Sequence, residues 1–224
     1  MSRHAASAAP RIVPFALYML FVAVGEIPGL PFPADPTTLY PIKAGLPLLA
    51  LLYYRKAYVE LRWSDLARTG DTLLALGTGA LVLLLWVHLD APWATQGTLA
   101  TGFDPESVAS GAGRTLLVAA RVAGASLVVP VMEELFWRSF LVRYILGKDF
   151  SAVPVGRLTP FAFAATALLF GLEHQLWVAG VLAGILYNLL LWRTKSIAQC
   201  ILAHAATNAG LAVFVLFTRQ WYFW

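Results

Sequence analysis

Six side chains that could carry out chemistry stand inside otherwise apolar stretches of the sequence. They are Glu133, Glu134, Arg138, His174, His204 and Asn208. A charge at bilayer depth costs several kcal/mol, so such residues usually face the interior of a helix bundle or a water-filled cavity. A glutamate with a histidine can hold and deprotonate a water molecule, and a second histidine with an asparagine can stabilise an oxyanion. These residue types predict a hydrolase that uses water as its nucleophile.

The two neighbouring glutamates are expected to have different partners. Consecutive residues of a helix point about 100° apart, so Glu133 and Glu134 cannot face the same spot. Glu134 and Arg138 are four residues apart, which is the favourable spacing for an ion pair along one helix. Glu133 is then free to face a cavity, and Pro130, one turn earlier, is expected to kink the helix. The alternative is a buried salt-bridge network that only locks helix packing.

The histidines have a structural alternative as well. His204 and Asn208 are four residues apart, so one helix face presents an imidazole and a carboxamide together. His174 stands near the end of an apolar segment, and Glu173 beside it is expected to point away from it. Polar side chains in membrane helices often serve only as hydrogen bonds between helices. The three polar clusters together are therefore a more specific indication of a catalytic site than any one cluster alone.

The composition is that of an integral membrane protein. Of the 224 residues, 59% are hydrophobic and 12% are charged, and the mean hydropathy is +0.71. A soluble domain carries about 25% charged residues. The net charge of +4 fits the basic loops of a membrane protein, so no nucleic-acid partner is expected. The single cysteine, Cys200, excludes an intrachain disulfide.

The apolar segments predict an all-α, multi-pass membrane bundle of about seven or eight transmembrane helices around a polar cavity. A span needs roughly 20 apolar residues. Seven candidate spans are present, at residues 12–30, 41–54, 72–89, 115–146, 160–176, 177–192 and 197–217. We expect a single membrane domain over residues 1–224, with amino-terminal helices in 12–114 and catalytic helices in 115–217.

The loops between these segments alternate in charge. Lys and Arg flank the start of the first span and follow the second, fourth and sixth spans, whereas residues 31–40 and 90–113 contain neither. Because cytoplasmic loops carry the excess of Lys and Arg, this pattern predicts a cytoplasmic amino terminus.

Three motifs, in this order, resemble the signatures of a known family. They are Glu133-Glu134-x-x-x-Arg138, Phe170-x-x-x-His174 and His204-x-x-x-Asn208. The sequence resembles the CPBP intramembrane proteases, which include the type II CAAX prenyl endopeptidases and bacteriocin-processing or immunity proteins. The resemblance covers roughly residues 115–217. The chain is also similar to the CAAX protease-related subgroup that accompanies bacterial exosortase and PEP-CTERM sorting systems, which implies a bacterial inner (plasma) membrane.

The resemblance implies a role for each motif residue. Glu133 would activate the water with help from His174, as in a glutamate protease, and His204 and Asn208 would stabilise the oxyanion. The other glutamate and the arginine of the first motif would orient the site as supporting residues. The family's fold is an all-α membrane bundle, commonly of eight helices.

A protease site at this depth would take a membrane-anchored or lipidated peptide that enters sideways from the lipid bilayer. The side chains expected to wall the cavity and contact substrate are Trp137, Phe140 and Phe170. Since Glu133 must be ionised to act as a base, activity should fall on the acid side.

Three alternatives remain. No metal or other cofactor is expected, but His174, His204 and a carboxylate could form a catalytic zinc site, although the chain has no His-Glu-x-x-His helix. The chain could also be a non-catalytic membrane scaffold or immunity protein whose polar residues only pack. Intramembrane Glu and His also build proton relays, so a transporter is the third alternative, although no internal repeat supports it.

Overall fold

The computed structural model of the protein describes residues 7–25, 36–97, 102–108 and 110–224. Within these residues the regular structure is entirely helical, as the sequence predicts. The first helices are α1 (Ala9–Gly25), α2 (Pro36–Tyr53), α3 (Thr69–Trp86) and the short α4 (Pro105–Val108). A central helix runs without interruption over Gly111–Leu146. It is followed by α8 (Pro160–Leu172), α9 (Trp177–Thr194) and α10 (Ile197–Thr218).

In the described ranges, seven apolar helices correspond to the seven predicted segments. Four of them, α3, the central helix, α9 and α10, are long and apolar enough to cross a membrane, and α1, α2 and α8 are shorter. The chain is therefore an integral membrane protein, while the number of helices that cross the bilayer stays a prediction. The expected end of the first span, at residues 26–30, lies outside the described residues. Helix α8 ends at Leu172, four residues earlier than expected.

Two π-helical segments change the winding of the central helix. It consists of α5 (Gly111–Ala123), a π segment (Gly124–Val128), α6 (Val129–Glu134), a second π segment (Leu135–Leu141) and α7 (Val142–Leu146). A π segment takes more residues per turn than an α-helix, because its hydrogen bonds span one residue more. Pro130, where the sequence predicts a kink, lies in the first turn of α6 directly after the first π segment. The irregularity next to this proline is therefore a change in winding.

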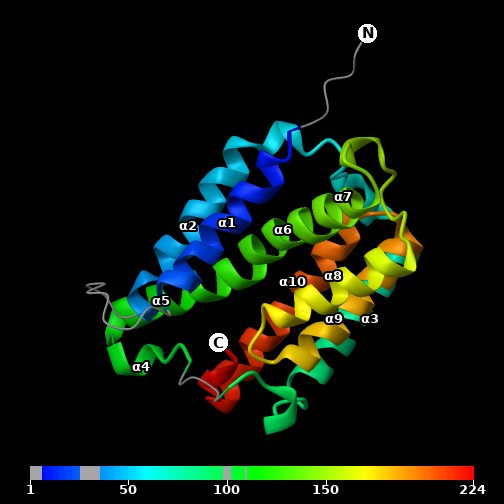
Figure 1. The fold of residues 1–224 in the computed structure, drawn as a ribbon. Coiled ribbons are helices and arrows are strands. Elements are labelled where there is room, and N and C mark those ends of the chain that lie inside the picture. Colours follow the sequence, from blue (N-terminus) through cyan, green and yellow to red (C-terminus); the bar gives the residue numbers. More distant parts are fainter. Residues whose placement is uncertain (1–6, 26–35, 98–101, 109) are drawn as a thin grey trace.

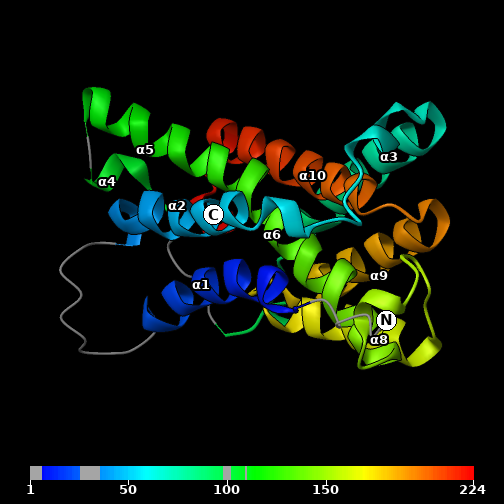
Figure 2. The same cartoon turned by 90° about the horizontal axis from the view of Figure 1, so that it is seen from above.

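The central helix lies between two groups of helices (Figures 1 and 2). Helices α1 and α2 pack against each other and against the central helix on one side. Helix α10 packs against it on the other side, where the pairs α3–α10 and α8–α9 complete the bundle. The buried core between these groups includes Met132, Leu135, Tyr187 and Leu191. This arrangement brings α6, α8 and α10, which carry the three motifs, to one place.

Small residues allow α8 and α9 to approach closely. A Cβ atom on Gly171 would lie 2.6 Å from the backbone nitrogen of Val181, and one on Gly184 would lie 2.9 Å from the Cα atom of Ala167. Membrane helices use such small residues because lipid supplies no hydrophobic force that drives helices together. The close contact fixes the turn between α8 and α9, which contains Glu173 and His174.

This turn is covered by the loop that follows α3. Helix α8 has 13 residues and is therefore about 20 Å long, shorter than a hydrocarbon core of about 30 Å. Non-helical backbone at membrane depth needs hydrogen bonds from the protein itself. The side-chain amide of Gln96 donates to the carbonyl oxygens of Leu172 and His174, each at 3.0 Å, and the backbone N–H of Gln96 donates to Gln175 at 2.7 Å.

A buried ion-pair network joins three segments at the opposite end of the bundle. Glu60, between α2 and α3, accepts from Arg11 of α1 at 2.6 Å and pairs with Arg143 of α7 at 3.4 Å. Ser139 donates to the same carboxylate. Burial alone would raise the pKa of Glu60, but the hydrogen bonds from Arg11 and Ser139 hold that pKa below its usual value. The network therefore ties α1, the α2–α3 connection and the central helix together.

Candidate active site

A cavity of about 230 Å³ lies inside the bundle, with room for several water molecules. All seven apolar helices, or the residues directly after them, contribute to its wall. The four residues predicted to be catalytic, Glu133, His174, His204 and Asn208, all line it. The structure thus brings together side chains from three separate segments of the sequence.

Glu134 forms the predicted ion pair along the central helix. Its Oε1 atom lies 3.3 Å from Nη1 of Arg138, and both side chains are almost fully buried, at 0% and 1% exposure. The guanidinium also lies over the ring of Phe170, 4.4 Å from its centre. The same Oε1 atom of Glu134 lies 2.9 Å from Nδ1 of His204. Because the carboxylate paired with Arg138 accepts, Nδ1 carries the proton, and the other ring nitrogen of His204 faces Glu133.

Glu133 faces the cavity, as the helix geometry predicts. Its side chain is 6% exposed, and its Oε2 atom lies 3.9 Å from Nε2 of His204. Within the described residues, this Oε2 atom has no hydrogen-bond partner. Buried polar atoms in native proteins are almost always paired with protein or water. The free oxygen beside a cavity of this size is therefore suited to hold a water molecule or a cation.

His174 is oriented by the helix that precedes it. Its Nδ1 atom lies 2.7 Å from the carbonyl oxygen of Phe170. A carbonyl oxygen can only accept, so Nδ1 donates, and in the neutral ring Nε2 is left as an acceptor. The edge of the Trp86 ring packs against the imidazole at 5.2 Å between ring centres.

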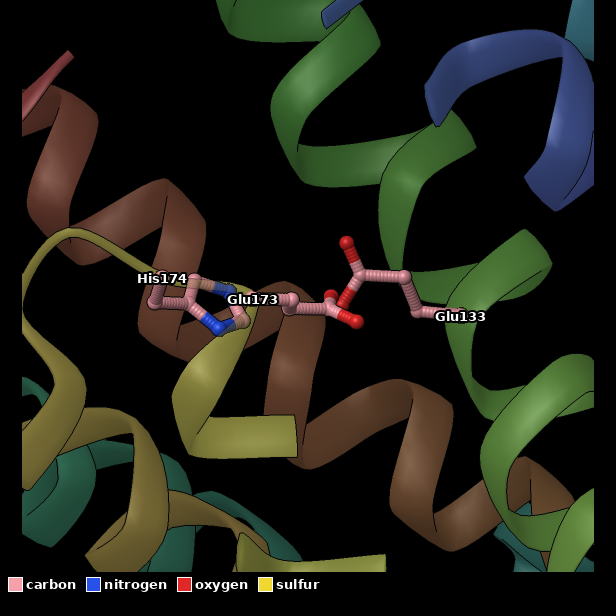
Figure 3. A group of neighbouring side chains, drawn as sticks. All are labelled: Glu133, Glu173 and His174. Atoms are coloured by element: carbon pink, nitrogen blue, oxygen red, sulfur yellow. The ribbon is translucent and has the colours of Figure 1, made fainter. Parts of the chain in front are cut away.

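Glu173 also belongs to this site, and the expectation that it points away is wrong. Glu133, Glu173 and His174 each offer a ligand atom, and these atoms lie within 4.8 Å of one another. Figure 3 shows the carboxylates of Glu133 and Glu173 facing each other, with the imidazole of His174 beside them. The 100° separation of neighbours holds only within a helix, and α8 ends at Leu172. The signal was present in the sequence, since Glu173 is ionisable and stands in an apolar segment.

The same three residues could hold a metal ion. Carboxylate oxygens and imidazole nitrogen are ligands that zinc accepts, and Oε2 of Glu133 and of Glu173 are buried without partners in the described part of the chain. The donor set therefore fits a divalent cation as well as a bound water. His204, the other histidine of the zinc set predicted from the sequence, lies outside this group of three.

Asn208 is held at the first π segment. Its Nδ2 atom donates to the carbonyl oxygen of Ala125 at 2.8 Å. A carboxamide nitrogen carries two hydrogens, so one remains for a ligand in the cavity. Tyr187 stacks on the ring of His204, with 5.2 Å between ring centres and 25° between planes. Asn208 and His204 are thus fixed side by side on α10.

The expected aromatic walls are only partly present. Phe170 lines the cavity, whereas Trp137 and Phe140 lie behind its wall. Trp137 packs edge-on against Phe170, and Phe140 packs against Tyr144 and Phe150. Both residues belong to the second π segment.

Residues 115–210 match the family model described as type II CAAX prenyl endopeptidase Rce1-like. This match contains all three motifs and the turn with Glu173. The family is one of membrane proteases. No curated protein and no solved structure matches the chain.

Proposed function

We propose that the chain is a membrane protease, because residues 115–210 match the Rce1-like model of type II CAAX prenyl endopeptidases, and that Glu133 activates the water that attacks a peptide bond. The observation that carries this proposal is the buried Oε2 atom of Glu133, which has no partner in the described residues and lies on the wall of a cavity with room for several water molecules. The water lies between this oxygen and Nε2 of His174, which accepts its second hydrogen bond.

The proposed reaction has two proton transfers. As the water oxygen bonds to the substrate carbonyl carbon, Glu133 takes one proton of the water. The remaining N–H of Asn208 donates to the oxyanion that forms, and His204 donates from Nε2 when its ring is doubly protonated. When the bond to nitrogen breaks, Glu133 returns the proton to the leaving amine. Glu134 holds His204 in the orientation that this requires.

The test is cleavage of a pool of membrane-anchored peptides by the purified protein, read by mass spectrometry. Glu133→Gln keeps the shape of the side chain but removes the base, so we expect cleavage to fall by about 100-fold or more. Glu106→Gln is the matched control, because Glu106 is half-exposed in an ion pair with Arg219 outside the cavity. Equal products from Glu133→Gln and the wild type would exclude Glu133 as the base and favour a scaffold whose polar residues only pack.

A second candidate is a metal-dependent protease, because Glu133, Glu173 and His174 form a three-ligand group. A bound cation would polarise the water or the substrate carbonyl. Full activity of a preparation shown to be metal-free would eliminate this candidate. Loss of activity after chelation, with recovery on adding zinc, would support it.

We further propose a membrane-anchored or lipidated peptide as substrate, entering from the bilayer. A soluble peptide of the same sequence should then be cleaved far more slowly than the anchored one. We also propose a cytoplasmic amino terminus in a bacterial inner membrane. Basic loops lie together at one end of the bundle, where Arg68 donates to the carbonyl oxygen of Thr194 and Lys195 donates to that of Gly156. Such loops are typical of the cytoplasmic side.

A further inference from the structure

Two cations line the cavity together with the catalytic residues. Lys43 is on α2 and Arg121 is on α5, and both belong to the same wall as Glu133. Lys43 lies over the ring of Tyr18, and Arg121 lies over the ring of Tyr40, each 4.4 Å from the ring centre. In the described part of the chain, neither cation has an acidic partner.

The buried arginines in the described part of the bundle are neutralised by carboxylates, unlike the half-buried Arg121. Arg138 is paired with Glu134, and Arg11 and Arg143 share Glu60. Charged groups inside a membrane protein are normally paired or mark the path of a ligand. The aromatic faces around Arg121 stabilise its charge, and in the described part of the chain its Nε is buried without a hydrogen-bond partner. These two cations therefore have the properties of an anion-binding subsite.

We propose that Lys43 and Arg121 bind the carboxylate at the carboxyl terminus of the peptide substrate. The inference rests on the proposed peptidase function, because an anion in this cavity is then part of the molecule that reaches Glu133. A guanidinium presents paired N–H groups that match a carboxylate, and an ammonium adds a point charge.

The separation between Arg121 and Glu133 determines how far the substrate's terminal carboxylate lies from the peptide bond that is cut. Arg121 precedes Glu133 by twelve residues on the central helix, or about 18 Å along its axis. The side chains of Arg121 and Glu133 both reach into the cavity, so the gap corresponds to a few residues of extended peptide. In a regular α-helix the two would point about 120° apart. The intervening π segment changes this angle and lets both line one cavity.

The first test compares two anchored peptides of one sequence that end in a carboxylate or in an amide. For the wild type we expect kcat/KM of the acid to exceed that of the amide at least tenfold. Lys43→Met and Arg121→Gln should each bring this ratio close to one, mainly through KM of the acid. Arg219→Gln, an exposed cation outside the cavity, should keep the preference. The ratio is measured within each variant, so it does not depend on the fraction that is folded.

A wild-type ratio near one, or a preference that survives both substitutions, would overturn the subsite. Binding to Glu133→Gln protein separates this inference from the proposed function. If Glu133→Gln protein binds the acid more tightly than the amide, and adding Lys43→Met removes this difference, the subsite is supported. This holds even if the wild type cuts neither peptide. Cleavage with equal binding of the two peptides overturns the subsite and leaves the protease function intact.

A lipid phosphate is the other oxyanion that these cations could hold. Phosphatidylglycerol added to the detergent micelles tests this source. If it binds in a manner that requires Lys43 while the acid and the amide remain equivalent, the proposal is overturned in favour of a lipid site.

Discussion

Glu133 and Glu134 are neighbours in sequence, but their surroundings give them different chemistry. Glu134 lies between a guanidinium and an imidazole, and its Oε1 atom contacts both. Glu133 lies one residue earlier, on another face of the helix, and keeps an unpaired oxygen beside the cavity. A paired carboxylate orients other groups, whereas an unpaired one is available to a water molecule.

Glu173 extends this argument to a third carboxylate. It faces Glu133 and lies beside His174, where a water or a cation would be held. We expect Glu173→Gln to lower kcat about 10- to 100-fold, because the amide lacks the negative charge and has one acceptor oxygen in place of two. Cleavage of the best anchored peptide measures this, with Glu106→Gln as the control. Wild-type kcat in Glu173→Gln would show that Glu173 only packs against its neighbours.

At the scale of helices, the site depends on how closely α8 approaches α9. The turn that carries Glu173 and His174 is fixed by this contact and by the amide of Gln96. Side chains on short turns keep their geometry only when the helices on both sides are held in place.

The prediction at this scale concerns Gly171. In Gly171→Ala the new methyl group would meet the backbone of Val181 and of Trp177 at 2.6 and 2.8 Å, so α8 and α9 must separate. We expect a loss of about 1–3 kcal/mol in stability, as for other overpacked sites, together with reduced cleavage. Thermal unfolding in detergent measures the first effect. Gly77→Ala is the matched control, because nothing lies within 4 Å of its added methyl group. Equal melting temperatures for the two variants would contradict the argument.

Sequence patterns predicted those parts of the site that depend on regular helices. The Glu134–Arg138 pair and the shared face of His204 and Asn208 follow from a spacing of four residues. Glu173 is misplaced because α8 ends one residue before it, at Leu172, and the position of Trp137 behind the cavity wall depends on its packing against Phe170. No local pattern announces a π segment or an early helix end, since both depend on packing against other helices.

Across the whole molecule, the ends of the helices are held together by different means. At one end, Glu60 joins α1, the α2–α3 connection and the central helix through buried ion pairs. At the other end, aromatic residues of the carboxyl terminus pack against the loop after α3, and Tyr222 donates to Asp90 at 2.9 Å. The first arrangement depends on pH because it requires an ionised carboxylate.

The folded pKa of Glu60 lies below its usual value of 4.5, so the network contributes stability above that pH. This contribution is lost as the pH falls through the lower, folded pKa. We expect the melting temperature of the wild type to drop below about pH 4.5 and that of Glu60→Gln to show a smaller drop. At neutral pH, Glu60→Gln should be less stable by about 3–5 kcal/mol, because two buried arginines lose their partner. An acid drop of the same size in both proteins would refute the role of Glu60.

The first π segment has a genetic consequence. The π segment Gly124–Val128 holds one residue more than an α-helix would use in the same place, because each of its hydrogen bonds spans one residue more. Loss of a single codon there would leave a regular α-helix in which Glu133 follows Arg121 by eleven residues, about 20° around the axis, so both side chains would still face one cavity. Substitutions that made the present residues wind as a regular α-helix would instead turn Glu133 and Glu134 by about 100° relative to Arg121. The winding of this segment, more than its length, is therefore what descendants of this chain must keep.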